Sequence, residues 1–422
     1  MAIQPEQKAI FIVDAYGPAR LFREYVKSKG LACIHIQSTP KPLPRLQLTD
    51  IDKYDRSIVH DGDLGSTANQ IRETCKNLNV LPHEIIAGVE PGVLLADQLS
   101  SHFALRTNGT AKSAARRDKF AMANVLERAG IAVSRYIKSA ALDDLLGFFE
   151  TEQGLPIVLK PLDSAGTNGV HICLTSRDVE HAYKAIIGVE NNMGSMNREV
   201  LAQGYLKGLE YFVNTVSHGG THYVTDIWLA EKVPLPGHAN IYDKNFLIDS
   251  HSREFTQLSN YVFRVLDALD IKYGAGHTEV IITENGPMIV ECASRISGAL
   301  DAKFNQACLG HDQIQVTLES YIDPESFMRR VGRPYPYKKA GLQMYLSAKR
   351  DGIVMESDLE NILNHHDAVI SYNLKFKIGD AIRQTIDLSS AIGVAHIVGA
   401  TPRDLLDTYK LIKSSVDQIL IT

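Results

Sequence analysis

Residues 276–295 read GHTEVIITENGPMIVECASR, and this segment constrains the architecture more than any other part of the chain. Two apolar runs flank ENGP at 284–287, a sequence typical of a tight turn, so a β-hairpin is predicted. Its strands would bring Glu279 and Glu291 together, and like charges repel unless a cation lies between them. Mg²⁺ binds few protein carboxylates together with substrate phosphates, so the pair is a candidate metal site, and Arg295 could hold an anion bidentately. Two unrelated surface glutamates are the alternative.

Two lysines upstream of this hairpin occupy positions suited to a phosphate contact. Lys119 opens a predicted helix in RRDKF, and Lys160 ends an apolar strand in VLKP. A lysine that leaves an apolar strand usually needs a partner. The adjoining stretch 163–169, DSAGTNG, offers backbone N–H groups that could cradle a phosphate. It is not a P-loop, because no Gly-Lys-Ser/Thr follows. A solvated lysine and an ordinary hairpin turn remain the alternatives.

The N-terminal part of the chain alternates apolar strands with helices. Such alternation predicts a parallel sheet with helices on its faces, a small doubly wound α/β domain. The predicted strands are 8–14, 31–37, 55–60 and 84–89, and the predicted helices are 19–29, 65–78 and 92–103. The first strand is followed by DAYGPAR, with one glycine where a dinucleotide fold needs three, so no NAD site is expected.

The remainder predicts an α+β arrangement of hairpins, with loops at 188–197 and 233–247. Polar residues at 107–113 and a Pro- and Tyr-rich stretch at 332–338 are candidate linkers. We therefore expect several domains with the bounds 1–113, 114–204, 205–331 and 332–422.

Composition excludes several classes of protein. The net charge is −5, with 44 basic and 49 acidic residues, so no nucleic-acid partner is expected. Five cysteines without C-x-x-C spacing indicate free thiols in a reducing compartment. No apolar run reaches the length of a membrane helix, and the N-terminal run is too short for a secretory leader. We expect a cytoplasmic protein with no membrane contact.

The order of these features resembles the ATP-grasp superfamily, in its branch of carboxylate–amine ligases. The likeness covers roughly residues 105–300 by motif and the flanks by topology, which implies an ATP-grasp fold with an N-terminal Rossmann-like domain. The family's hinge, E-x-x-hydrophobic-x-G-x-E, is matched by QGYLKGLE at 203–210, where Gln203 replaces the usual glutamate. In the metal motif, Ala293 replaces the usual asparagine, so a third metal oxygen is missing or comes from water.

The resemblance implies a set of ATP-binding residues: Lys119, Lys160, Ser164, Ala165, Gly166, Gln203, Tyr205, Leu206 and Glu210. Within this set, the lysines and the small-residue loop hold the phosphates, the hinge backbone meets adenine, and Glu210 meets the ribose hydroxyls. Glu279 and Glu291 would bind Mg²⁺, with Mn²⁺ as an alternative.

The segments GHTEV and ECASRISGA look most like bacterial L-amino-acid ligases. This resemblance implies formation of a dipeptide from two unprotected amino acids through an aminoacyl phosphate, with release of ADP and phosphate. The loops 163–169 and 233–247 would act as lids that exclude water. The implied catalytic residues are Arg295, Lys160 and His277, and the implied substrate residues are Glu90, Arg295 and Gly298.

Within these assignments, His277 would support the acyl phosphate or orient the substrate, and a structural histidine is its alternative. Glu90 would meet a substrate amino group. The partners are small-molecule amino acids, and a homodimer is the default assembly. Two other functions stay open: an ATP-grasp ligase for another carboxylate, such as a peptide natural product or a nucleotide precursor, and a non-catalytic ATP-binding protein.

Overall fold

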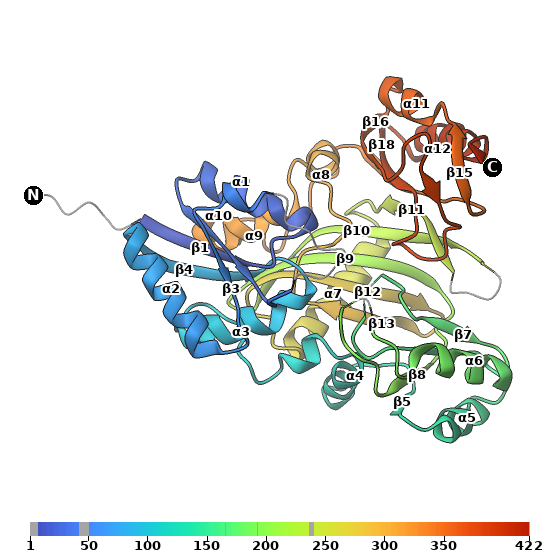
Figure 1. The fold of residues 1–422 in the computed structure, drawn as a ribbon, viewed down its shortest axis with the longest axis horizontal. Helices are drawn as coiled ribbons and strands as arrows, with labels where there is room; N and C mark the ends of the chain where they lie inside the picture. Colours follow the sequence, from blue (N-terminus) through green and yellow to red (C-terminus); the bar gives the residue numbers. More distant parts are fainter. Residues whose placement is uncertain (1–6, 42–49, 165, 192, 236–239, 422) are drawn as a thin grey trace, which may run out of the picture.

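The computed structural model describes residues 7–41, 50–164, 166–191, 193–235 and 240–421. A large antiparallel sheet lies at the centre of the molecule (Figure 1). An N-terminal unit, blue in Figure 1, lies at one end of it, and a smaller green unit and the red C-terminal unit lie toward the other. This mixed α/β architecture agrees with the class predicted from the sequence.

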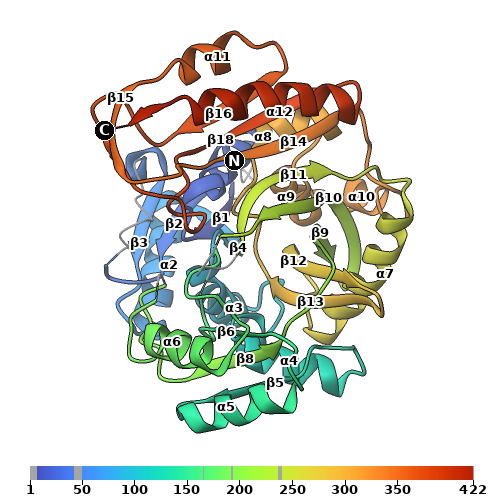
Figure 2. The same ribbon diagram turned by 90° about the vertical axis from the view of Figure 1, so that its right-hand side faces the viewer.

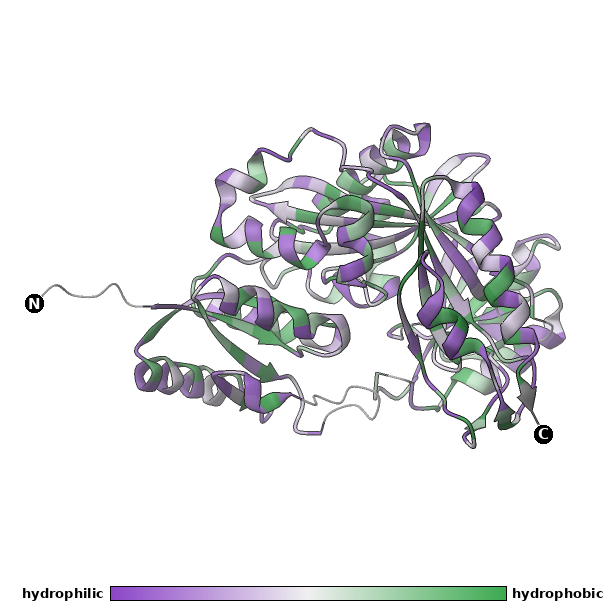
Figure 3. Cartoon of the chain, turned by 90° about the horizontal axis from the view of Figure 1, so that it is seen from above, coloured by the Kyte–Doolittle hydropathy of each residue, from purple (hydrophilic) through white to green (hydrophobic). Residues whose placement is uncertain are grey.

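The N-terminal unit is a four-stranded parallel sheet of order β3-β2-β1-β4. Its strands are largely hydrophobic, whereas its helices mix both kinds of residue (Figure 3). The doubly wound prediction is confirmed, because apolar strand runs alternate with helices that bury one face each. The elements are β1 (Gln7–Val13), α1 (Leu21–Ser28), β2 (Ala32–Gln37), β3 (Arg56–Val59), α2 (Leu64–Leu78), β4 (Val80–Ala87) and α3 (Val93–His102), with 3-10 turns at Gly17–Arg20, Ile51–Lys53 and Glu90–Gly92.

The green unit follows a 3-10 turn, Ala114–Arg116, and helix α4 (Lys119–Arg128). Its antiparallel sheet has the order β5-β8-β6-β7, and two helices pack on one face around Leu145, Leu159 and Val179. The edge strand β5 pairs with β8 along Tyr136–Ser139. The elements are β5 (Tyr136–Ser139), α5 (Leu142–Thr151), β6 (Ile157–Lys160), β7 (His171–Cys173), α6 (Ser176–Ile186) and β8 (Val200–Gly204).

The large sheet has eight strands in the order β13-β12-β9-β10-β11-β14-β18-β16. It runs without a break across the proline-rich stretch at 332–338, because β11 pairs with β14. Its elements up to that stretch are β9 (Leu209–His218), β10 (Thr221–Val233), β11 (Ile241–Leu247), α7 (Arg253–Ala268), β12 (Gly274–Thr283), β13 (Gly286–Ala293), α8 (Ala302–Leu309), α9 (Gln313–Ile322) and α10 (Pro324–Met328).

The C-terminal unit supplies the last three strands of the large sheet and covers them with helix α12 (Figure 2). A second, small sheet forms from β15, β17 and β19. The elements are β14 (Ala340–Leu346), β15 (Gly352–Glu356), α11 (Leu359–His365), β16 (Val369–Leu374), β17 (Ala381–Ile382), β18 (Gly393–Gly399), α12 (Pro402–Asp417) and β19 (Leu420–Ile421).

One loop prediction is wrong. The segment 233–247 was expected to be a flexible lid, but residues 241–247 form β11 in the middle of the large sheet. Tyr242 and Leu247 are buried there, and the strand pairs with β10 and β14 on its two sides. Prolines and a glycine at 234–237 suggested a loop, and the short apolar pattern that follows them was not recognised as a strand.

Buried polar contacts fix the N-terminal unit to the large sheet. Arg116 donates to the carbonyl of Leu269 at 3.0 Å, and Arg106 donates to that of Tyr321 at 2.7 Å. A buried Asp97 carboxylate balances Arg116 at 2.8 Å. Removing one partner from such a buried pair is strongly destabilising, so this junction is rigid. Among the described residues, no helix combines the length and hydrophobicity needed to cross a bilayer.

Candidate active site

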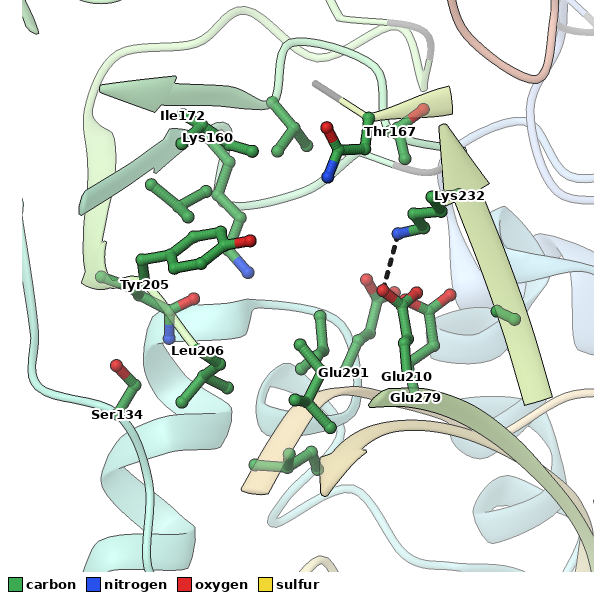
Figure 4. Close-up of a pocket in the computed structure, with 18 of the residues that line it drawn as sticks. Ser134, Lys160, Thr167, Ile172, Tyr205, Leu206, Glu210, Lys232, Glu279 and Glu291 are labelled. Carbon is green, nitrogen blue, oxygen red and sulfur yellow. Dashed lines mark hydrogen bonds and ion pairs between the residues drawn. The ribbon is translucent and has the colours of Figure 1, made fainter. Parts of the chain in front are cut away.

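A cavity of about 450 Å³ lies between the green unit and the large sheet. Its walls come from β6 and β8 on one side and from β9, β10, β12 and β13 on the other (Figure 4). We call it the first cavity. The structure brings most of the predicted ATP-binding and metal residues to its lining, namely Lys119, Lys160, Ser164, Gly166, Gln203, Tyr205, Leu206, Glu210, Glu279 and Glu291. Ala165 lies outside the described residues.

Lys119 is fixed at the first position of helix α4. The helix starts there because Asp118 caps it, accepting the backbone N–H of Ala121 at 2.8 Å. The Lys119 Nζ donates to the carbonyl of Ser164 at 2.9 Å and lies 3.0 Å from Glu291 Oε2. Burial alone would lower the pKa of Lys119, but the carboxylates of Glu291, Glu90 and Asp163 together outweigh it and raise that pKa. The lysine therefore stays charged and joins the loop to the hairpin.

Lys160 ends strand β6, and its ammonium group points into the first cavity (Figure 4). Burial, together with the charge of Lys119, lowers the pKa of Lys160 to about 8. A buried cation with a lowered pKa is stabilised by an anion that binds beside it. The position suits a phosphate group.

The loop after β6 approaches this lysine through backbone groups. Gly166, Thr167 and Gly169 all have positive φ, at 68°, 63° and 70°. A side chain at Gly169 would press on the ring of Pro161 at 3.0 Å, so this position needs glycine. The Ser164 hydroxyl donates to the carbonyl of Asn168 at 3.1 Å and closes the turn. Such a conformation can present N–H groups to an anion.

The hinge after β8 forms the apolar end of the first cavity. A side chain at Gly208 would collide with the carbonyl of Ile282, so the chain can pass there only as glycine. Tyr205 and Leu206 line the cavity with a group of aliphatic side chains that could enclose a flat ring, namely Val158, Ile172, Ile281 and Ile289. Ser134 lines the same end.

Glu210 is held by two residues that the sequence did not single out. Its carboxylate accepts from Lys232 Nζ at 2.7 Å and from the Tyr242 hydroxyl at 2.9 Å (Figure 4). Lys232 lies near the end of β10, and Tyr242 lies in the strand that was expected to be a loop. The pairing of β9 with β10 brings Lys232 beside Glu210, and the pairing of β10 with β11 adds Tyr242.

The two glutamates of the hairpin meet as predicted. Glu279 and Glu291 are opposite each other in the register of β12 and β13. Although burial acts to raise it, the pKa of Glu279 is held well below its usual range by His277 and by the charges of Lys232 and Lys119. The Glu279 carboxylate therefore stays ionised.

These side chains suit a hard cation that completes its shell with phosphate oxygens. Two ionised carboxylates side by side are a common protein contribution to Mg²⁺ binding. Ala293 is fully buried and offers no oxygen. Among the described residues, no three His, Cys, Asp or Glu side chains gather as a metal-ligand group. The fit is therefore to a metal that binds together with its nucleotide.

A second cavity, of about 810 Å³, adjoins the first. Gly166, Tyr242, Glu279 and Leu388 line both. The second cavity also receives three of the predicted substrate and catalytic residues, His277, Arg295 and Gly298. The two spaces therefore meet beside the hairpin glutamates.

Glu90 lies behind Arg295 and is not among the residues that line either cavity. The Arg295 Nε donates to Glu90 Oε2 at 2.9 Å, and the Arg117 Nη1 lies 3.6 Å from Glu90 Oε1. This pairing orients the guanidinium group. Contact of Glu90 with a substrate amino group stays a prediction.

The floor of the second cavity is a row of polar groups on the large sheet. Asn214 accepts from His277 Nδ1 at 2.7 Å, which leaves Nε2 facing Glu279 at 3.7 Å. Further along, Gln343 Nε2 donates to His396 Nε2 at 3.1 Å, and Asn245 donates to Gln343 Oε1 at 3.1 Å. Burial lowers the pKa of His396, so its ring is neutral and accepts that bond. Apart from His277, no member of this row was predicted from the sequence, because the five residues lie on five different strands.

Comparisons with known proteins agree with this geometry. Residues 153–302 match the ATP-grasp domain family. Dapdiamide A synthase of Enterobacter agglomerans is 32% identical over 97% of this chain and 96% of its own length. The L-arginine-specific L-amino acid ligase of Bacillus subtilis is 25% identical over 52% of this chain and 54% of its own. The crystal structure of an L-amino acid ligase from Bacillus licheniformis superposes with a TM-score of 0.76 at 15% identity, covering 98% of both chains.

Proposed function

Since the chain belongs to the ATP-grasp family and is a carboxylate–amine ligase, we propose that it joins two unprotected L-amino acids into a dipeptide. The reaction would pass through an aminoacyl phosphate and release ADP and phosphate. The observation that carries the proposal is the junction of the two cavities at Glu279, where a nucleotide phosphate and an amino-acid carboxylate can meet. The Bacillus subtilis relative, an L-arginine-specific L-amino acid ligase, supports amino acids as substrates.

In the first cavity, the aliphatic slot around Tyr205 and Leu206 would hold adenine, and Glu210 would accept hydrogen bonds from the ribose hydroxyls. Lys119 and Lys160 would hold the phosphates below the glycine loop. Glu279 and Glu291 would hold Mg²⁺ or Mn²⁺, which when bound neutralises phosphate charge. Phosphoryl transfer needs positioning and charge neutralisation more than covalent help from the protein.

In the second cavity, Arg295 would hold the carboxylate of the first amino acid, with its guanidinium fixed by Glu90. A carboxylate oxygen attacks the γ-phosphorus, ADP leaves, and the acyl phosphate forms at the junction. His277, held through Nδ1 by Asn214, would orient the reacting group through Nε2. The amine of the second amino acid then attacks the acyl carbon, and phosphate leaves as the peptide bond forms.

The test is a panel of amino-acid pairs with Mg²⁺ and ATP, in which phosphate release and product mass are measured together. The proposal expects ADP, phosphate and a dipeptide in equal amounts for a limited set of pairs. Phosphate release that depends on another carboxylic acid, and on no amino-acid pair, would overturn the dipeptide assignment. ATP binding without any acid-dependent hydrolysis would overturn catalysis itself.

A further inference from the structure

A short turn of the C-terminal unit reaches the junction of the two cavities. It comprises residues 385–391, between β17 and β18, and we call it the 385–391 turn. Leu388 at its tip is half-buried, lines both cavities, and packs against the core of the large sheet. A Cβ at Gly166 would lie 4.0 Å from the Leu388 Cβ, so the turn lies close to the glycine loop of the green unit.

The 385–391 turn is held in place by its own hydrogen bonds. The Ser390 hydroxyl accepts the backbone N–H of Ile386 at 2.9 Å and that of Asp387 at 3.0 Å. Asp387 in turn accepts the N–H of Ser390 at 2.8 Å. Lys375, which directly follows β16, donates from its Nζ to the carbonyl of Leu388 at 3.3 Å. These contacts fix the tip, so the position of Leu388 does not depend on the glycine loop alone.

The chemistry at the junction gives an apolar residue a specific task. An acyl phosphate is destroyed when water adds to its acyl carbon, because phosphate leaves and the free acid returns. Leu388 has no group that can bind or polarise a substrate, but its side chain can fill the space through which water would enter. The charged residues at this junction attract water, and the apolar Leu388 side chain would keep that water away from the acyl carbon.

We propose that Leu388 is a positioning residue that closes the junction between the two cavities and protects the acyl phosphate from hydrolysis. The inference rests on the proposed function. It gives the C-terminal unit a role in joining phosphoryl transfer to peptide formation, because the apolar 385–391 turn of this unit lies beside the glycine loop at the junction. Replacing the leucine would let water compete with the amine while the phosphoryl transfer continues.

The experiment measures released phosphate and formed peptide in the same reaction for the wild type, L388A, L388M and L411A. Leu411 is an exposed leucine of α12 that lines neither cavity, so L411A controls for the loss of a surface leucine. We expect about one phosphate per peptide for the wild type, L388M and L411A. For L388A we expect a several-fold excess of phosphate over peptide.

The outcomes separate this inference from the proposed function. If the wild type forms no peptide, the proposed function fails. If the wild type forms peptide and L388A keeps the one-to-one ratio, the inference about Leu388 fails alone, whether or not the overall rate falls. L388M retains apolar volume, so a ratio as poor as that of L388A would also contradict a water-excluding role.

Discussion

The two cavities meet at one carboxylate but are built in different ways. The first cavity is lined mainly by residues between Lys119 and Glu291, and this stretch contains the motifs recognised in the sequence. The second gathers residues from the N-terminal unit, at Gly17, through to His396 near the end of the chain. The difference teaches that the residues proposed to bind ATP follow local motifs, whereas those proposed to hold the acid are brought together by the topology of the sheet.

The largest expected effect is the loss of charge in the first cavity. K160A and E291Q should each lower turnover by about 10³-fold, because K160A removes a cation beside the transferring phosphoryl group and E291Q removes a carboxylate proposed to hold the metal. Steady-state phosphate release measures the loss, and urea unfolding checks that the fold persists. Wild-type turnover in either variant would contradict the assignment of ATP activation to the first cavity.

A smaller effect is expected from Arg295 in the second cavity. R295K keeps the charge but loses the paired donor geometry, so kcat/KM for the acid should fall roughly 10- to 100-fold. The KM for ATP should change little. E90Q is the matched control: it keeps Arg295 and weakens only its orientation, so its effect should be milder. An R295K effect confined to ATP would place the arginine in the first cavity's chemistry.

The pH dependence of ATP binding tests Lys160 directly. Its pKa of about 8 means that the free protein loses this charge as the pH rises through that value. Bound phosphate favours the charged form, so ATP binding must take up a proton above the pKa. Lys160 should therefore leave the Kd for ATP constant below pH 8. Above pH 8 it should raise the Kd by up to about tenfold per pH unit.

The control for that pH dependence is K160R, whose guanidinium stays charged throughout the range. Calorimetric titration with ATP alone, without amino acids, measures both proteins. We expect the weakening above pH 8 in the wild type and its absence in K160R. A similar slope in both would assign the titration to another group.

The smallest effect is expected for Gln343, on the floor of the second cavity. Q343L removes hydrogen bonds to His396 and Asn245 on the floor of the second cavity. Each such bond contributes about 1 kcal/mol, so the KM for the preferred acid should rise several-fold. The KM for ATP should stay unchanged. Equal changes for both substrates would show that the two cavities are not separable.

Features set by local sequence signals could be predicted, whereas features set by the pairing of distant strands could not. The N-terminal sheet was predicted strand by strand, because its apolar runs and helix signals are local. The meeting of Glu279 and Glu291 was predictable, since a four-residue turn joins their strands. Strand β11 was missed, because its identity depends on pairing with β14, about a hundred residues further along the chain.

The contacts missed in the site have the same cause. Lys232 reaches Glu210 through the pairing of β9 and β10, Tyr242 reaches it through β11, and Leu388 reaches the junction from a turn near the end of the chain. No spacing in the sequence links these residues to the motifs they meet. A lysine and a leucine in such positions look like ordinary strand and surface residues until the sheet is assembled.

The central claim is that the acid's carboxylate attacks the γ-phosphate of ATP at the junction of the two cavities. Its most direct test is a reaction with an amino acid carrying ¹⁸O in the carboxylate, followed by mass analysis of the released phosphate and nucleotide. The account predicts that one ¹⁸O atom passes from the acid into inorganic phosphate and that ADP carries none. Label in AMP, or phosphate without label, would contradict it.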